Sequence, residues 1–374
     1  MPGDRRVDSI LRPLMAADDA ADGDPMNLPP PPAPPAPPGA GAHRPPLAAP
    51  ANAALGTGPD GAELVVEIRG VSRRFGPVPA LSDLTLLVPK SRITVLLGPN
   101  GAGKTTAIRV ITGALDPDRG HVRTFGHDPN VFGEQVRRRC GVVSAKPALY
   151  DRLSGWDNLE YSAELYGLGR NAVGPIREAA ARFGILEALD QQVGGYSTGM
   201  KTRLALARSV LHEPDLLLFD EPTSGLDPES SHAVLELIRE MTTDGRTVVM
   251  CTHLLVEAEG LADQVVILES GTDLLAGPQD ELLRRYWPDH LVVLDAENPM
   301  ALDRVADWPG VKAYRRDGRV EVQLDDLARV PDLVARLAVE GVRLTRVEPH
   351  QPSLEELYFA VRRERRAQGV EAPL

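Results

Sequence analysis

The chain has 374 residues, 43% of them hydrophobic and 25% charged, which is an ordinary composition for a globular protein of two or three domains. A net charge of −12 argues against a protein whose whole surface grips nucleic acid, although a local basic patch stays open. No run of about 18 apolar residues predicts a membrane span. The polar N-terminus leads into no apolar signal segment, so any work at a membrane would require docking to another chain.

The two cysteines, Cys140 and Cys251, lie far apart in the sequence and fit no CxxC or Cys/His spacing. We expect both to be buried free thiols in a reducing compartment. A disulfide or a metal site is the alternative to that interpretation.

Residues 1–61 form the first region, which is rich in Ala, Pro, Gly and Asp and contains a proline-rich run at 29–38. Almost no aromatic or β-branched residues occur there, so the segment cannot bury enough apolar area to offset its ordering entropy. We predict a disordered tail with polyproline II character. It is either a solvated tail or a ligand for a partner's groove.

Short apolar runs alternate with helical periodicities from Glu63 to about residue 285, which predicts a largely parallel α/β sheet. We assign residues 62–285 to this domain. The expected strands are 63–68, 81–88, 92–97, 216–219 and 247–251. Helices are expected after Gly103, within 154–190, and at 203–211 and 232–241.

The rhythm changes after residue 285. We expect strands at 291–294 and 342–347, helices at 300–305, 331–340 and 353–366, and a hairpin at 311–324 that turns at Asp317-Gly318, a strong hairpin signal. The pattern predicts a small α+β unit of split β-α-β type in the third domain, residues 286–374. It is too short for another catalytic site, so we interpret it as a regulatory or docking domain.

Residues 98–106 read Gly-Pro-Asn-Gly-Ala-Gly-Lys-Thr-Thr and follow the apolar run 93–97. A buried strand, a glycine turn and a helix start are the setting of a phosphate-binding loop, in which backbone N–H groups converge on phosphate oxygens. Lys104 would reach the β- and γ-phosphates, and the Thr105 hydroxyl would hold Mg²⁺. The alternative is a chance glycine-rich turn. The residues expected to bind the nucleotide here are Gly98, Pro99, Asn100, Gly101, Ala102, Gly103, Lys104, Thr105 and Thr106.

A second apolar run, Leu216 to Phe219, ends in Asp220 and Glu221. An Asp at the carboxyl end of a core strand can orient the shell of Mg²⁺ beside a phosphate loop. The adjacent Glu can polarise a water for in-line attack on the γ-phosphate. A strand that simply ends in acidic turn residues is the alternative, and the phosphate loop argues against it.

Three further segments complete the pattern: Tyr196-Ser197-Thr198-Gly199-Met200, then Ser224-Gly225-Leu226-Asp227, then Thr252-His253. In their order and spacing, these segments and the two above resemble the ATP-binding subunits of ABC (ATP-binding cassette) transporters over about residues 63–285. The resemblance implies a phosphate-loop NTPase fold with a helical subdomain. The C-terminal unit, ending in Gln351 to Tyr358, is similar to the accessory domain of drug-exporter cassettes.

The resemblance also implies roles for individual residues. Two cassettes would stack head to tail, each ATP lying between one subunit's phosphate loop and the other's Ser197 and Gly199. Glu221 would act as catalytic base or position the water, and His253 would bind the γ-phosphate and hold Glu221. Thr105 and Asp220 would bind the metal. Asp227 would sit at the dimer contact, and Phe75 would stack on adenine, although a core aromatic is the alternative for Phe75.

Two departures from the family pattern bear on turnover. Ala145 stands where the family has a Gln that links the metal site to the membrane partner, so Ser144 or solvent must fill that role, or hydrolysis is slowed. Thr198 and Met200 replace the Gly and Gln of the family's signature. Ser197 and Gly199, which would touch phosphate, are retained, and we expect turnover to survive.

The leading interpretation is the ATPase subunit of an exporter: a homodimer or paired cassette that drives a separate permease at the cytoplasmic face of the membrane, without nucleic acid. The segment from Tyr150 to Leu159 would face the permease. Two alternatives stay open. One is a nucleotide-gated regulatory subunit of low turnover, suggested by Ala145, and the other is a soluble ABC ATPase that acts on ribosomes or DNA.

Overall fold

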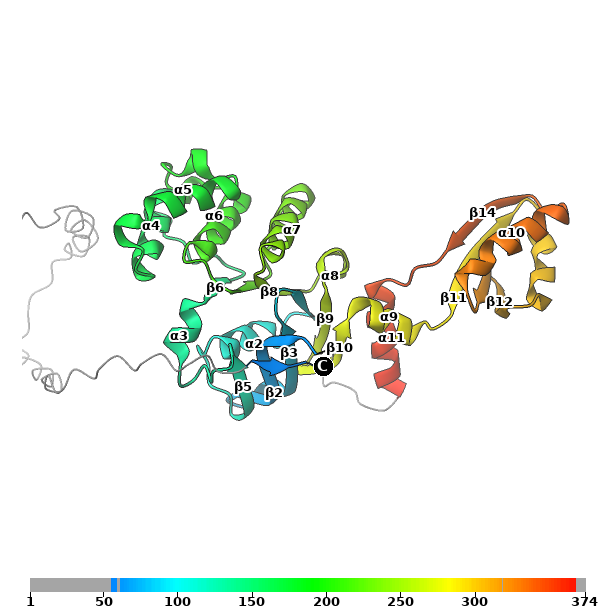
Figure 1. The fold of residues 1–374 in the computed structure, drawn as a ribbon, viewed down its shortest axis with the longest axis horizontal. Coiled ribbons are helices and arrows are strands. Elements are labelled where there is room, and N and C mark those ends of the chain that lie inside the picture. The colour runs from blue at the N-terminus through cyan, green and yellow to red at the C-terminus, as the bar shows by residue number, and fades with distance from the viewer. Residues whose placement is uncertain (1–54, 59–60, 318, 368–374) are drawn as a thin grey trace, which may run out of the picture. The chain divides into compact units, whose positions relative to one another are not determined.

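The structure is a computed structural model that describes residues 55–58, 61–317 and 319–367 (Figure 1). The predicted N-terminal tail therefore lies almost wholly outside the described residues. Within them the chain forms three sheets, two in the cassette and one in the C-terminal region. Among the helices of these residues, none combines the length and the apolar character that a membrane crossing needs.

The central sheet of the cassette has six strands in the order β10-β9-β4-β8-β7-β6, and all neighbours are parallel except β9 and β10. The prediction of a largely parallel sheet is confirmed. The strands are β4 (Ile93–Leu97), β6 (Cys140–Val143), β7 (Leu216–Asp220), β8 (Thr247–Thr252), β9 (Gln264–Glu269) and β10 (Thr272–Pro278).

Every residue of β4, β7 and β8 is buried, because both faces of this sheet are covered. Alternate side chains of each strand enter different clusters: Val95 and Phe219 belong to one, Leu96 and Leu218 to the other. Continuous apolar runs such as Leu216 to Phe219 therefore fill both clusters at once, while the polar residues that follow them lie at the carboxyl edge.

An antiparallel sheet accompanies the central one. Its strand β2 (Glu63–Phe75) pairs with β1 (Gly56–Thr57), β3 (Val78–Pro89) and β5 (Arg119–Thr124). The predicted strands at 63–68 and 81–88 are confirmed and extend further than the apolar pattern indicated. The irregular register of β2 against β3 shows why, since each bulge interrupts the alternation on which the prediction depended.

Helices occupy the segments between the strands. They are α2 (Lys104–Ile111), α3 (Gly133–Arg138), α4 (Gly155–Leu165), α5 (Val173–Arg182), α6 (Thr198–Val210), α7 (Pro228–Thr243), α8 (Leu255–Leu261) and α9 (Gln279–Tyr286), with short 3-10 helices η2 (Gly169–Asn171), η3 (Leu186–Ala188) and η4 (Val193–Gly195). Helices α4, α5 and α6 pack against one another as a helical subdomain, the green group of Figure 1. Ser154 starts α4 with a capping box, because its hydroxyl accepts from Asp157 N and Asp157 reaches back to Ser154 N.

The C-terminal sheet has the order β12-β13-β11-β14, and all neighbours are antiparallel. Its strands are β11 (His290–Ala296), β12 (Val311–Asp317), β13 (Arg319–Leu324) and β14 (Leu344–Pro349), and its helices are η5 (Pro299–Asp307), η6 (Leu327–Arg329) and α10 (Val330–Val339). Strand β13 lies between β11 and β12, which confirms the predicted split β-α-β arrangement. The hairpin of β12 and β13 is also confirmed, although Gly318 of its turn lies outside the described residues.

The helix expected at 300–305 is confirmed as the 3-10 helix η5, which extends from Pro299 to Asp307. Asn298 caps it by accepting a hydrogen bond from Met300 N, two residues on, at 3.2 Å, and Pro299 opens the first turn. This short-range cap favours the tighter turn of a 3-10 helix.

The final helix, α11 (Leu354–Ala367), follows the C-terminal sheet in the chain but packs on the cassette (Figure 1). Leu354, Leu357 and Val361 are buried in a cassette cluster, beside α8 and α9. Glu259 of α8 accepts a hydrogen bond from Leu354 N at 3.2 Å. The domain division at residue 286 stays a prediction, and α11 contributes to the core on the other side of that division.

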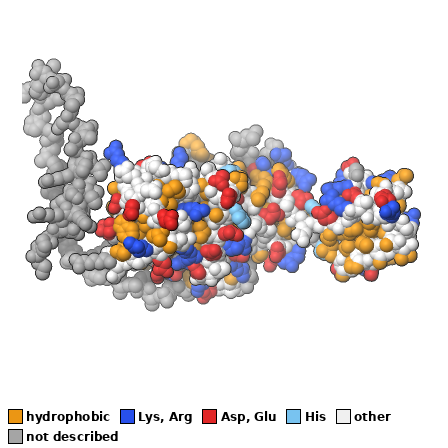
Figure 2. Space-filling model, turned by 90° about the horizontal axis from the view of Figure 1, so that it is seen from above, with side chains coloured by type: hydrophobic (Ala, Val, Ile, Leu, Met, Phe, Trp, Pro, Cys, Tyr) orange, Lys and Arg blue, Asp and Glu red, His pale blue; other side chains and the backbone are white. Residues whose placement is uncertain are grey.

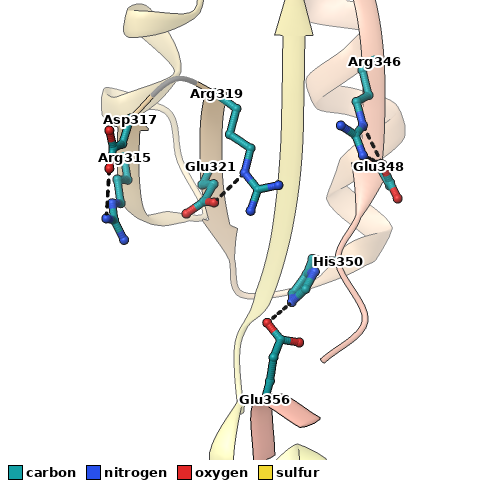
Figure 3. Close-up of polar contacts among 8 residues, drawn as sticks. All are labelled: Arg315, Asp317, Arg319, Glu321, Arg346, Glu348, His350 and Glu356. Carbon is teal, nitrogen blue, oxygen red and sulfur yellow. Dashed lines mark hydrogen bonds and ion pairs between the residues drawn. The ribbon is translucent and has the colours of Figure 1, made fainter. Parts of the chain in front are cut away.

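Three pairs of charged side chains in the C-terminal sheet form along single strands (Figure 3). Arg319 lies 2.9 Å from Glu321, and the pairs Arg315–Asp317 and Arg346–Glu348 have the same spacing of two residues. Residues two apart on a strand share one face, so these pairs cover one side of the sheet with charge. On the molecular face shown in Figure 2, acidic and basic side chains are interspersed.

Candidate functional site

The predicted phosphate loop runs from the end of β4 to the start of α2. At two of its glycines, contacts exclude any other residue: a Cβ on Gly98 would lie 2.3 Å from Leu268 O, and one on Gly103 would lie 2.6 Å from Ala80 O. Gly103 also has φ +103°, which L-residues rarely adopt, and it is the N-cap of α2. Backbone atoms of β3 and β9 therefore lie too close to these two positions for any residue other than glycine.

Lys104, the first residue of α2, is buried against this loop. Its Nζ donates to Gly98 O at 2.6 Å and Pro99 O at 3.2 Å, and lies 3.3 Å from Oε1 of Glu221. An ammonium with three donors at the start of a helix, beside a glycine-rich loop, is suited to bind phosphate oxygens.

The two residues predicted to bind metal are in contact. Thr105 Oγ1 donates to Oδ2 of Asp220 at 2.6 Å, and Asp220 is buried at the end of β7. A hydroxyl and a carboxylate fit Mg²⁺, which takes oxygen ligands and is commonly completed by phosphates and water. In the described part of the chain no three acidic, His or Cys residues gather as a metal site of their own.

Glu221 and His253 come from the ends of neighbouring strands, β7 and β8. Oε1 of Glu221 lies 3.2 Å from Nδ1 of His253, and Glu221 N donates to Cys251 O at 2.9 Å. Glu221 has φ +51°, a left-handed conformation that is unfavourable for this residue type. Lys104, Glu221 and His253 therefore form one chain of contacts, with the carboxylate at its centre.

The remaining predicted residues lie in a second group. Ser197 is the N-cap of α6, where its hydroxyl accepts from Met200 N at 3.2 Å, and Gly199 lies in the first turn of that helix. Asp227 is the N-cap of α7, and its hydrogen bonds from the Ser230 hydroxyl and backbone lower its pKa. Among the described residues, none of these three makes a hydrogen bond or ion pair with the phosphate loop, and Ser197 and Asp227 are exposed at the starts of their helices.

Phe75 stands apart from both groups, at the end of β2. Phe75 is 45% exposed, and the Arg73 guanidinium lies 5.4 Å from the centre of its ring. A residue this exposed is not a core aromatic, so the alternative interpretation is wrong. Its stacking on adenine stays a prediction.

Ala145 borders a cavity of about 90 Å³ that also reaches Ser144, Thr198 and Glu221. This volume accommodates about three waters. Both substitutes considered for the missing Gln, the Ser144 hydroxyl and solvent, thus have access to the space beside Glu221.

The two cysteines are buried and free, as predicted. Burial raises the pKa of Cys140 to about 12 and that of Cys251 well above its usual value. Cys251 precedes Thr252 on β8, yet its protonated thiol takes no part in the polar contacts of the site.

One buried carboxylate near the site was not predicted. Glu257 of α8 accepts hydrogen bonds from Thr223 and Thr252, which follow Glu221 and precede His253. A Glu in a seven-residue helix carries no sequence signal for burial, and only the fold shows its partners.

The comparisons with known proteins agree with this geometry. The ABC transporter family profile matches residues 81–224. The daunorubicin resistance ATP-binding protein DrrA3 of Streptomyces coeruleorubidus is 33% identical over 80% of this chain and 96% of its own length. The Nod factor export ATP-binding protein I of Bradyrhizobium diazoefficiens is 31% identical over 79% and 95%. A solved ATP-binding subunit of an ABC transporter matches with a TM-score of 0.55 at 31% identity, covering 59% of this chain and 93% of that one.

The chain belongs to the ABC transporter ATP-binding proteins. It is the ATP-binding subunit of an ABC exporter, an ATPase that couples ATP hydrolysis to transport. Proteins of this kind typically pair with permease subunits.

Proposed function

We propose that this subunit works as a dimer that closes around two ATP molecules and drives a separate permease from the cytoplasmic face of the membrane. The chain of contacts Lys104–Glu221–His253 carries the proposal, because it joins a phosphate-binding cation to a carboxylate and an imidazole in one site. A γ-phosphate placed at Lys104 would have Glu221 beside it to orient and deprotonate the attacking water.

The division of the site into two groups supports the dimer. The phosphate loop, Asp220, Glu221 and His253 would hold ATP from one side. Ser197 and the backbone of Gly199, at the positive end of α6, would meet the γ-phosphate of the other subunit's ATP. Asp227 would lie at the contact between subunits, and Phe75 would stack on the adenine.

Mg²⁺ would be held by Thr105 and Asp220, whose oxygens lie 2.6 Å apart. Bound there, the ion would neutralise charge at the phosphate oxygens. The residues around it do the rest: Asp220 orients the Thr105 hydroxyl, and Lys104 keeps Glu221 within reach of the same region.

An exposed aromatic patch supports docking to a permease. Tyr150 and Tyr161 meet edge to face at 5.4 Å between ring centres, and both are exposed, as is Leu165 near the end of α4. Aromatic residues at a protein surface are typical of interfaces. This patch belongs to the predicted permease-facing segment and the helix that it begins.

The cargo is set by the permease and not by the groups described here. The names of the two relatives mention two different compounds, daunorubicin in one and Nod factor in the other. We propose export of a small molecule through the partner and leave its identity to that chain.

A test uses full-length Glu221→Gln, which keeps the shape of the side chain but removes its basicity. We expect ATP turnover to fall at least about 100-fold, while ATP binding persists and a closed dimer accumulates by light scattering. Glu240→Gln, an exposed change on α7, is the matched control and is expected to match wild type. Equal turnover in Glu221→Gln and wild type would contradict the proposal.

The same variant, tagged and purified with ATP from solubilised native membranes, identifies its partner by mass spectrometry. A polytopic membrane protein in stoichiometric amount supports the transporter assignment of this chain. Ribosomal proteins or DNA in its place would support the soluble alternative.

The cavity at Ala145 favours one second candidate, a regulatory subunit that binds ATP and turns it over slowly. Ala145→Gln would restore the family's side chain in that space. A rise of turnover above wild type in Ala145→Gln, together with equal turnover in wild type and Glu221→Gln, would support the regulatory candidate.

A further inference from the structure

Two carboxylates are buried among the acidic residues that the structure describes, Asp220 and Glu257. Asp220 has its proposed role beside Thr105. Glu257, 7% exposed on α8, belongs to none of the segments through which the family was recognised. A buried carboxylate is costly unless its oxygens are satisfied, so the question is what holds it.

Both oxygens of Glu257 accept short hydrogen bonds from threonine hydroxyls. Thr223 Oγ1 donates to Oε1 at 2.5 Å, and Thr252 Oγ1 donates to Oε2 at 2.6 Å. Distances of this kind are characteristic of hydroxyls bound to an ionised carboxylate. Among the described residues, no Lys, Arg or His forms an ion pair with Glu257. Its hydrogen-bond partners are the two threonines.

The two threonines are themselves buried and lie next to the reacting groups. Thr223 is two residues after Glu221, and Thr252 directly precedes His253. The Thr252 hydroxyl also accepts from Leu254 N at 3.1 Å, so it fixes the backbone on both sides of His253. Glu257 thus joins the segment after β7 to the segment after β8.

The bridge acts on groups that need positioning. Glu221 has φ +51°, and its contacts with His253 and Lys104, at 3.2 and 3.3 Å, are longer than tight hydrogen bonds. A residue held in an unfavourable conformation stays there only when its surroundings fix it. The hydrogen bonds of Glu257 with Thr223 and Thr252 supply such a constraint on the segments that carry Glu221 and His253.

We propose that Glu257 is a positioning residue for ATP hydrolysis: it holds the Glu221 and His253 segments in register through Thr223 and Thr252 without touching the nucleotide. The assignment rests on the proposed roles of Glu221 and His253. A positioning residue alters the rate of the chemical step more than nucleotide affinity, since the phosphate loop is held by other contacts.

The test compares full-length Glu257→Ala, Glu257→Gln and Val256→Ala. We expect Glu257→Ala to lower kcat about 10- to 100-fold, with the ATP concentration for half-maximal rate within about 3-fold of wild type. Glu257→Gln can still accept from one threonine and donate to the other, and is expected to recover most of the rate. Val256→Ala, on the same helix with its side chain 82% exposed, is the control and should match wild type. If Glu257→Ala turns over like Val256→Ala, the proposal is overturned.

Two further measurements cover the other outcomes. If Glu257→Ala does not fold, Thr252→Val and Thr252→Ser replace it: loss of rate in the first and retention in the second support the bridge, and equal rates overturn it. Hydrogen exchange is independent of turnover. We expect the amides of Glu221 and Leu254 to exchange faster in Glu257→Ala than in Val256→Ala, and equal exchange would contradict the bridge.

These readouts separate the two proposals. If wild type and Glu221→Gln show the same turnover, the proposed function fails, and exchange alone then decides whether Glu257 holds the two segments. If Glu221→Gln loses turnover while Glu257→Ala does not, the proposed function stands and the role of Glu257 fails.

Discussion

The parallel sheet of the cassette and the antiparallel sheet of the C-terminal region use polar residues in opposite ways. In the cassette, Asp220, Glu221 and His253 follow buried strands and meet at one edge. In the C-terminal sheet, charged residues such as Arg319 and Glu321 lie within the strands and cover a face. Parallel pairing brings the ends of several strands together, so it concentrates function; antiparallel alternation spreads charge over a surface.

The largest expected effect is the loss of stability when α11, which follows the C-terminal sheet, is packed less tightly on the cassette. Leu357→Ala in α11 removes a fully buried side chain from the cassette cluster and should lower the free energy of unfolding by about 2–5 kcal/mol. Denaturant unfolding of the full chain measures it. Val339→Ala in α10 is the control, because that side chain is almost wholly exposed and should change little. Equal effects would show that α11 does not belong to the cassette core.

The next effect is a loss of ATP affinity that is expected for a lysine of the nucleotide site and not for a lysine of the C-terminal sheet. Lys104→Ala removes a cation that contacts Gly98, Pro99 and Glu221, and hydrogen bonds of charged groups are worth about 1.5–3 kcal/mol. We expect ATP affinity to fall about 10- to 150-fold, measured with a fluorescent ATP analogue. Lys312→Ala, an exposed lysine paired with Asp289 beside the C-terminal sheet, should bind as wild type does. Unchanged affinity in Lys104→Ala would remove the phosphate-binding role.

A smaller effect depends on pH. His212 donates from Nε2 to Cys140 O at 3.0 Å and stacks on Tyr166, while its buried Nδ1 has no partner. Burial lowers its pKa below the usual 6.5. Below that value the unfolded chain takes up a proton that the folded chain resists, so this contribution to stability is present above 6.5 and is lost as the pH falls.

The measurement is Tm between pH 7.5 and 5.5. Wild type should lose more Tm on acidification than His212→Gln does. His232→Gln, which changes an exposed histidine on α7, should keep the wild-type pH dependence. If the Tm of His212→Gln falls with pH as steeply as that of wild type, His212 is not the titrating group.

The smallest effect is expected on the C-terminal sheet itself. Arg319→Ala removes one exposed pair with Glu321, and exposed ion pairs contribute about 0.2–1 kcal/mol, less at high salt. Thermal unfolding at low and high salt measures the change. A loss comparable with that of Leu357→Ala would show that this sheet depends on its surface charges.

Much of the fold was predictable because its signals are local. The uninterrupted apolar strands β4 and β7, and the glycines at 98 and 103, each carry their meaning within a few residues. The phosphate loop and the acidic end of the apolar run 216–219 predicted that Thr105 and Asp220 serve one metal, and the structure has their oxygens 2.6 Å apart. What the sequence could not show depends on contacts between distant segments: the burial of Glu257 and the packing of α11 on the cassette.

The return of α11 to the cassette has a consequence for the order in which the protein is made. Leu354, Leu357 and Val361 complete a cassette cluster, yet they are synthesised after every strand of all three sheets. Domains generally fold as units during synthesis, from the N-terminus onward. During synthesis, an apolar surface of α8 and α9 therefore stays uncovered until the C-terminal sheet and then α11 have emerged from the ribosome. A premature stop after β14 would therefore leave a translated but unfinished ATPase domain.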